Sequence, residues 1–295
     1  MEKRRKRVAF YFILPTLLIL LILGAYPLFY IIYLSFHKLY LMTGPEPKFV
    51  GFANYLKILT VDKYFYQILG NTVIWVVGST ILQLLLGFPA ALVLNSKRIK
   101  FRGFFRGLIL ISWVMPIITA GIVWRWVYNA DWGILNYYLS KIGLIKNYVN
   151  WLGNSKTVWP ALLVASLWKG FPYMTVMFLA GLQGIPVQLY EAARVDGANA
   201  WNIFRKITLP IMRPIIAVVS MTSAILTWNN FRMIWVLTQG GPGYRTTVLS
   251  TYVYVKTFTF YRFGEGATVA MISFIFVIAM IIVYILLTKS YKLKW

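Results

Sequence analysis

An apolar stretch in the second half of the chain is interrupted by amide and aromatic side chains, in TWNNFRMIW at 227–235. Asn229 and Asn230 offer hydrogen-bond donors and acceptors, and Phe231 offers an aromatic face. Because an unpaired amide is costly in apolar surroundings, both asparagines should face a cavity or a neighbouring helix. Apolar walls with a few placed amides are typical of ligand pockets, and this mixture suits sugars. The alternative is that the amides only hold helices together. Trp168 and Tyr173, in LWKGFPYM at 167–174, complete the candidate site.

The ionisable residues exclude most catalytic chemistry. The chain has no cysteine and one histidine, His37, which argues against disulfides, iron–sulfur clusters and zinc sites. Its seven acidic residues form no pair deep in an apolar stretch, as a membrane hydrolase or metal-dependent transferase would need. The phosphate-binding pattern G-x-x-x-x-G-K-[ST] is also missing. We therefore expect no enzyme, no metal and no bound cofactor in this chain, and any ATP-driven work must draw on another subunit.

Composition and length predict a membrane protein. The chain is 60% hydrophobic and 13% charged, against about 25% charged residues in soluble domains. A helix needs about 20 apolar residues to cross a bilayer. We predict an all-α integral membrane fold, in a single domain over residues 1–295. Pro27, Pro89, Pro116 and Pro172 should be tolerated inside the spans, and the first span is too long for a cleaved signal peptide. The six transmembrane helices are expected at 8–34, 69–94, 104–128, 158–182, 212–237 and 266–288.

Lysine and arginine predict the orientation. Five lie at 3–7, five at 97–106, four at 194–213 and three at 289–294, all on one side of a six-span chain. Because basic residues favour the cytoplasmic side, both termini and the loop at 183–211 should be cytoplasmic. The net charge of +23 is thereby assigned to membrane surfaces and lipid, not to nucleic acid.

Three cations lie inside the predicted spans, where they are rare and usually functional. Arg125 and Arg232 lie toward the outer ends, and Arg125 should extend to the surface. Lys169 lies nearer the middle, where we expect a structural role. Since no acid accompanies these cations, an anionic ligand is an open alternative, because arginine binds phosphate strongly.

The loop at 183–211 contains the least hydrophobic long stretch of the second half, EAARVDGANAWNIFRKITLP at 191–210. We predict two short helices, broken at Asp196-Gly197 because glycine accepts the left-handed conformation that ends a helix, with the second stopped at Pro210. Small residues beside Glu191 suit docking in a groove of a partner protein. A helix lying on the bilayer surface is the alternative.

This stretch resembles the EAA loop of binding-protein-dependent permeases, the membrane subunits of bacterial and archaeal ABC importers. LWKGFPYM, LAGLQGIP (179–186) and LTQGGPG (237–243) are similar to the carbohydrate branch, in particular its maltose-type first permease subunit. We expect the six-span form, without the extra N-terminal spans and external domain of larger members. The family pattern is met at Glu191, Ala192, Ala193, Gly197, Ile207, Leu209 and Pro210.

The resemblance implies the type I importer permease fold in a bacterial or archaeal inner membrane, and a division of labour. An extracytoplasmic solute-binding protein would deliver a sugar to a pathway formed by this chain and a second, homologous permease subunit. Two ABC ATPase subunits, which hold ATP and magnesium, would each receive one EAA loop. The alternatives are an anionic solute, such as glycerol 3-phosphate or an acidic sugar, and outside the family a membrane-embedded enzyme or a passive channel.

The resemblance also implies roles for single residues. Glu191 would pair with basic or donor groups of the ATPase cleft, Ala192 and Ala193 would permit close approach, and Gly197 would allow the sharp turn. The family places part of its sugar site at positions matching Asn229 and Phe231. The residues assigned to ATPase coupling are Glu191, Ala192, Ala193, Asp196, Gly197, Ile207, Leu209 and Pro210.

Overall fold

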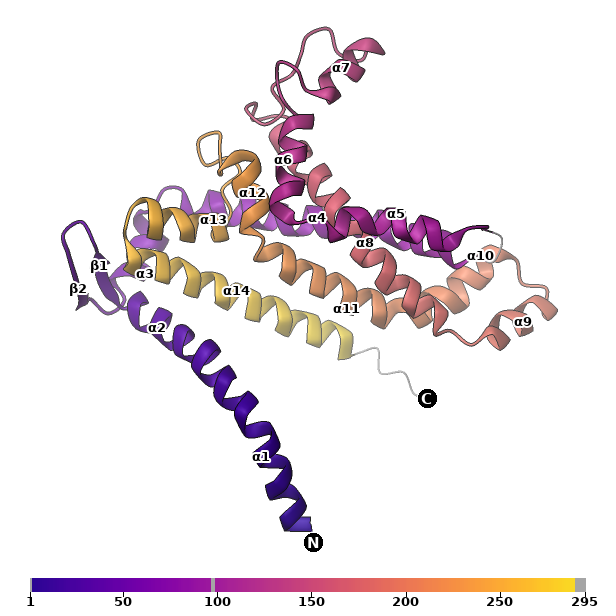
Figure 1. Cartoon of the computed structure of the whole chain (residues 1–295), viewed down its shortest axis with the longest axis horizontal. Helices are drawn as coiled ribbons and strands as arrows, with labels where there is room; N and C mark the ends of the chain where they lie inside the picture. The colour runs from indigo at the N-terminus through magenta and orange to yellow at the C-terminus, as the bar shows by residue number, and fades with distance from the viewer. Residues whose placement is uncertain (1, 97–98, 290–295) are drawn as a thin grey trace. The chain divides into compact units, whose positions relative to one another are not determined.

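The computed structural model describes residues 2–96 and 99–289, and most of them are helical (Figure 1). Lys97, Arg98, Lys292 and Lys294, which belong to the predicted cytoplasmic segments, lie outside the described residues. The chain forms two compact units, Met1–Phe65 with Tyr252–Ile275, and Tyr66–Thr251 with Phe276–Trp295. Each unit is described by itself below.

The first unit begins with a long, bent apolar helix. α1 (Glu2–Leu20) continues through a π-helical turn at Leu21–Ala25 into α2 (Tyr26–Ser35). Phe10–Ser35 is apolar enough to cross a membrane, and only 6% of its most apolar window is buried by the rest of the chain. This helix therefore leaves its apolar surface to lipid or to a neighbour, as expected of the predicted first span.

A β-hairpin follows this span, and the all-α prediction missed it. β1 (His37–Tyr40) pairs antiparallel with β2 (Gly44–Phe49). The turn LMTG and the prolines at 45 and 47 obscure the strand pattern in the sequence. α3 (Ala53–Leu56) and a π-helical turn at Lys57–Val61 complete the segment. Asn54 fastens the hairpin to α3, since its amide donates to the carbonyls of Ser35 and His37 at 3.0 and 2.9 Å.

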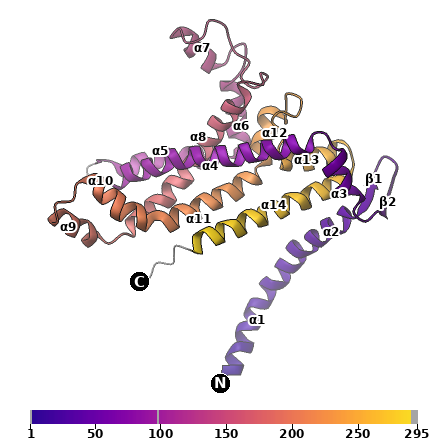
Figure 2. The same ribbon diagram turned by 180° about the vertical axis from the view of Figure 1, so that it is seen from behind.

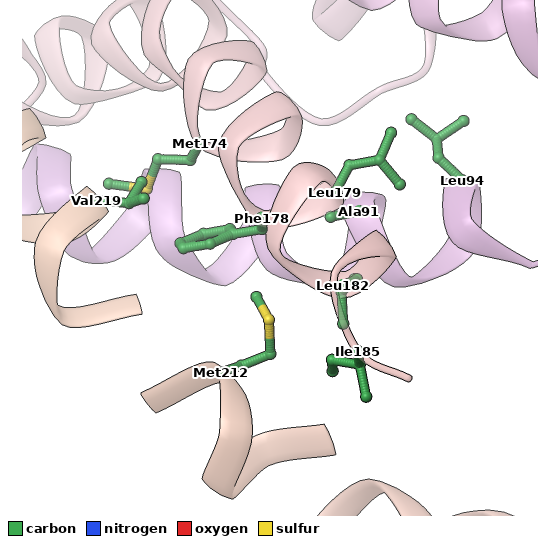
Figure 3. Close-up of a cluster of buried hydrophobic side chains, with 9 residues drawn as sticks. All are labelled: Ala91, Leu94, Met174, Phe178, Leu179, Leu182, Ile185, Met212 and Val219. Atoms are coloured by element: carbon green, nitrogen blue, oxygen red, sulfur yellow. The ribbon is translucent and has the colours of Figure 1, made fainter. Parts of the chain in front are cut away.

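The second unit is built from helices. α4 (Phe65–Asn95), α8 (Val158–Gln183) and α11 (Leu209–Trp228) lie side by side in both views (Figures 1 and 2). Between them lies an apolar cluster that includes Ala91, Met174, Phe178 and Met212 (Figure 3). A side chain at Gly87 would place its Cβ 2.8 Å from the Cβ of Met174, so glycine is required for this close packing. The remaining helices are α5 (Arg102–Val114), α6 (Ile117–Val127), α7 (Ile134–Lys141), α9 (Val187–Val195), α10 (Ala200–Ile203), α12 (Phe231–Thr238), α13 (Leu249–Tyr254) and α14 (Phe263–Lys289), the last two shared with the first unit.

The predicted spans are confirmed with two corrections. Five described helices are long and apolar enough to cross a membrane, and α5 with α6, bent by 93° at a short break, brings the number to six when the pair is counted as one span. The first correction is that the predicted third span is not one continuous helix. It breaks at Pro116, because the residue before a proline disfavours helical geometry, and Met115 adopts φ −53°, ψ 132°. Pro27, Pro89 and Pro172 do lie inside helices.

The second correction concerns the fifth span. Pro210 does not stop a helix, because the chain is helical from Ala200 to Trp228 through a π-helical turn at Phe204–Thr208. In that turn the amide of Leu209 donates to the carbonyl of Phe204, five residues back, and this wider turn accommodates the proline that follows. The span ends at Trp228, short of the predicted residue 237, and α12 is a separate helix.

Candidate functional site

A cavity of about 390 Å³ lies within the second unit, among α4, α8, α11, α12 and the α5–α6 break. Three of the predicted site residues line it: Tyr173, Asn229 and Asn230. Phe231 and Trp168 are not among its lining residues. Phe231 stacks on Trp235 with ring centroids 5.3 Å apart, and Trp168 packs edge-to-face on Trp124 at 5.9 Å.

The two asparagines lie where α11 ends and α12 begins. The amide of Asn229 donates to the carbonyl of Ile225 at 3.1 Å, and the amide oxygen of Asn230 accepts from the backbone N–H of Met233 at 3.3 Å. Asn230 therefore caps α12, which is why the chain starts a new helix here. Each of these bonds uses one group of an amide that has several donors and acceptors, so both side chains keep capacity for a ligand.

Gln83 on α4 was not predicted from the sequence, yet it joins three helices at the cavity wall. Its amide nitrogen donates to the carbonyl of Ser166 at 3.1 Å, and its amide oxygen accepts from the hydroxyl of Ser223 at 2.8 Å. A side chain at Gly170 would clash with this amide. One signal was available in the sequence: a lone glutamine in a long apolar span needs partners, because an unpaired amide there is costly.

Lys169 on α8 holds the break between α5 and α6. Its ammonium donates to the carbonyls of Ser112, Trp113 and Met115 at 2.9, 2.6 and 2.8 Å. The carbonyl of Ser112 would bond to the N–H of residue 116 in a straight helix, but proline has none. The lysine thus replaces hydrogen bonds that the break removes, in agreement with the structural role predicted for it.

The charged side chains that line the cavity are all basic. Lys169 and Arg232 both line it, and none of the described residues that line it is acidic. Arg125 lies instead at a second cavity of about 460 Å³, with Asn129, Asp131 and Gln239. Tyr128 adjoins that second cavity and donates to the carbonyl of Ala161 at 3.0 Å.

The break predicted at Asp196-Gly197 is confirmed. α9 ends in a Schellman motif, in which Gly197 has φ +75° and its N–H donates to the carbonyl of Arg194 at 3.0 Å. The N–H of Ala198 donates to the carbonyl of Ala193 at 2.9 Å. Asn199 then caps α10 by accepting from the N–H of Asn202 at 2.8 Å. Two adjacent caps fix the turn between α9 and α10.

The predicted coupling residues divide between an exposed loop and a packed helix. Glu191, Ala192, Asp196 and Gly197 are exposed, and Ala193 is half-buried. Ile207, Leu209 and Pro210 are half-buried in the helical turns that lead into α11. Apolar side chains flank the exposed loop, since Val195 is 88% and Trp201 65% exposed. The turn between α9 and α10 thus carries exposed apolar side chains on both of its sides.

One further contact joins the loop to the span behind it. The hydroxyls of Tyr190 on α9 and Thr208 at the start of α11 lie 3.2 Å apart, and Thr208 is buried. α9 is therefore tied to α11 as well as to α8, the helix that precedes it in the chain.

Comparison with known proteins gives concordant matches. The family described as "Binding-protein-dependent transport system inner membrane component" matches residues 83–292. The trehalose/maltose transport system permease protein MalF of Thermococcus litoralis is 36% identical over 288 residues, which cover 97% of this chain and 95% of that protein. The sulfoquinovosyl glycerol transport system permease protein SmoG of Agrobacterium fabrum is 31% identical over 276 residues, covering 94% and 88%.

A solved structure shares the fold. A chain of a bacterial ABC transporter that imports the acidic polysaccharide alginate superposes with a TM-score of 0.79, covering 99% of this chain and 97% of that one at 23% sequence identity. The predicted permease fold is thereby confirmed.

Proposed function

Because the chain belongs to the family of binding-protein-dependent transport system inner membrane components, we propose that it is the sugar-conducting permease subunit of an ATP-driven importer. The family predicted from residues 191–210 is confirmed, and with it a multi-pass inner membrane protein that serves transport, not catalysis. The observation that carries the sugar assignment is the cavity of about 390 Å³, which gathers amides, hydroxyls and aromatic rings from several helices. The names of the maltose- and sulfoquinovosyl-type relatives support the same substrate class.

In this proposal Asn229, Asn230 and Tyr173 contact the sugar directly, and Gln83 and the Lys169 ammonium hold the wall against which it binds. Sugar hydroxyls both donate and accept, so amides suit them better than fixed charges do. Phe231 and Trp168 do not line this cavity and pack on Trp235 and Trp124, so the proposal gives them no direct contact with the sugar.

The exposed loop would couple ATP hydrolysis by the partner subunits to transport. Separate ABC ATPase subunits, which bind ATP and magnesium, would receive α9 in a surface cleft, with Glu191 meeting basic groups and Val195 an apolar patch. Ala192 and Ala193 leave room for that approach. The Schellman turn at Gly197 supports this role because it gives the loop one fixed shape. A second permease subunit would complete the pathway, and an extracytoplasmic solute-binding protein would deliver the sugar, with both termini of this chain cytoplasmic.

An acidic substrate is the second candidate, and one observation favours it. Lys169 and Arg232 line the cavity without an accompanying carboxylate. The ammonium of Lys169 is engaged by three carbonyls, so Arg232 is the group that an anion would meet.

Competition for uptake by the complete transport complex separates the two candidates. Neutral oligosaccharides, uronates and glycerol 3-phosphate would be tested against the labelled substrate, in the wild type and in Arg232→Met. A neutral-sugar permease is inhibited by the neutral compounds in both proteins. Inhibition by anions alone, abolished in Arg232→Met, would replace the neutral sugar with the acidic one.

A further inference from the structure

The first unit contains a network of buried ion pairs. The ammonium of Lys256 lies 2.9 Å from both Asp62 Oδ2 and Glu265 Oε2, and Lys57 Nζ lies 2.7 Å from Glu265 Oε1. The hydroxyl of Tyr252 donates to Asp62. Burial raises the pKa of Asp62, but the hydrogen bonds from Tyr252 and Lys256 and the lysine charge outweigh it and hold the pKa below its ordinary value. Both acids are therefore committed to partners inside the unit.

A pocket of about 380 Å³ opens beside this network, between the hairpin and the start of α14. Lys38, Lys57 and Arg262 line it, and the only acid among its described lining residues is Glu265. The Glu265 side chain is 9% exposed, whereas those of Lys57 and Arg262 are 50% and 43% exposed. Arg262 reaches Glu265 only at 3.5 Å. Lys57 and Arg262 thus pair with Glu265, but about half of each side chain remains exposed to solvent. The pocket therefore has more positive than negative charge.

The hairpin adds to this surplus in a fixed geometry. Lys38 lies directly opposite Lys48 across the two strands, an arrangement of like charges that costs stability. Arg262 pairs with Tyr40 through a backbone bridge and lies over its ring, with the guanidinium carbon 5.7 Å from the ring centroid. Arg262 is therefore preorganised, and an anion bound near Lys38 would offset its repulsion with Lys48.

We propose that Lys38, Lys57 and Arg262 form a docking pocket for a carboxylate side chain of the solute-binding protein. The inference rests on the proposed function, which puts residues 36–65 on the extracytoplasmic side. A half-exposed, charged pocket suits a soluble partner that arrives and leaves, since rim charges steer encounter. Permanent contacts between membrane subunits are larger and more apolar. Arginine beside lysines matches the planar, two-oxygen geometry of a carboxylate.

Charge reversal tests the proposal in the complete complex, reconstituted in nanodiscs of neutral phosphatidylcholine. Lys38→Glu and Arg262→Glu would be compared with Lys63→Glu, an exposed lysine of the same unit that does not line the pocket. Arg262→Gln keeps hydrogen bonding at the same site and guards against a folding defect. Two quantities would be measured: the Kd of the purified solute-binding protein, and its half-maximal concentration for stimulating ATP hydrolysis.

We expect both values to rise about tenfold in the two pocket reversals at low salt, less in Arg262→Gln, and to stay unchanged in Lys63→Glu. The difference should narrow near 1 M salt, where the Debye length falls to about 3 Å. Unchanged values in a wild-type-like complex would overturn the docking pocket and leave the proposed function standing. If the reversals change these values only when the nanodiscs contain anionic lipid, the pocket binds lipid headgroups, and the docking proposal is overturned. A wild-type complex that does not bind the protein at all overturns both.

Discussion

Replacing Lys169 with methionine should destabilise the break between α5 and α6. Methionine keeps the length of the apolar stem but removes the ammonium that caps Ser112, Trp113 and Met115. Each uncapped carbonyl costs roughly 1–3 kcal/mol in apolar surroundings. Lys169 is half-buried in a cavity wall that water can reach, so the lower value applies. For the three carbonyls the total is about 3 kcal/mol. This corresponds to a change of about a hundredfold in the equilibrium between the native conformation of the break and other conformations.

The assay is a double-mutant cycle on the purified complex. The free energy of unfolding in detergent and the KM for sugar uptake would be measured for Lys169→Met, Pro116→Ala and the double variant. Alanine at 116 restores the N–H that the carbonyl of Ser112 lacks, so loss of the lysine should cost less in that background, by about 1 kcal/mol. Lys146→Met, at an exposed position, controls for loss of a lysine as such.

Two results would refute this reasoning. If Lys169→Met costs the same free energy with proline and with alanine at 116, the lysine does not serve the break. If it weakens uptake of anionic competitors only, the ammonium binds substrate and not carbonyl groups.

Three further predictions follow from the loop, the cavity and the ion pairs. Gly197→Asn should transport nearly as well as the wild type, because asparagine tolerates positive φ. Gly197→Pro loses the hydrogen bond to the carbonyl of Arg194, so its complex should hydrolyse ATP without uptake. Equal uptake in both variants would contradict the coupling role. Asn229→Leu should weaken sugar affinity about ten- to hundredfold, as roughly 1–3 kcal/mol is lost, with co-purification of the second permease unchanged; loss of that subunit would instead make Asn229 a contact between helices. Because the pKa of Asp62 is lowered on folding, its stabilisation is present above its ordinary pKa of 3.8 and is lost as pH falls further. Acid unfolding of the first unit should therefore begin only below about pH 4, and Tyr252→Phe should raise that onset, which a pH titration of protease resistance would measure.

The sequence was sufficient for the membrane helices because their signal is local. A run of about 20 apolar residues crosses a bilayer whatever surrounds it, so the first, second, fourth and sixth spans lie within a few residues of their predicted ranges. The turn at Gly197 is equally local, since only the next residues on either side decide it.

The cavity could be predicted only in part, because its residues meet from helices far apart in the sequence. Asn229 and Asn230 could be recognised as adjacent amides in an apolar stretch. The role of Gln83 depends on its hydrogen bonds to Ser166 and Ser223 on two other helices, which the sequence does not show. The break at Pro116 depends in the same way on Lys169, more than 50 residues later. A proline pattern alone does not distinguish a tolerated kink from a capped break, as Pro172 and Pro116 demonstrate.

The most direct test of the central claim is uptake of labelled sugar into sealed proteoliposomes that contain this chain, its second permease and the ATPase subunits. With the sugar-loaded solute-binding protein on the outer face and ATP inside, we expect accumulation against a gradient, and Glu191→Lys should abolish it while the complex stays assembled. Equilibration of the sugar without ATP would make the chain a passive channel, and undiminished accumulation with Glu191→Lys would show that the loop does not couple hydrolysis to transport.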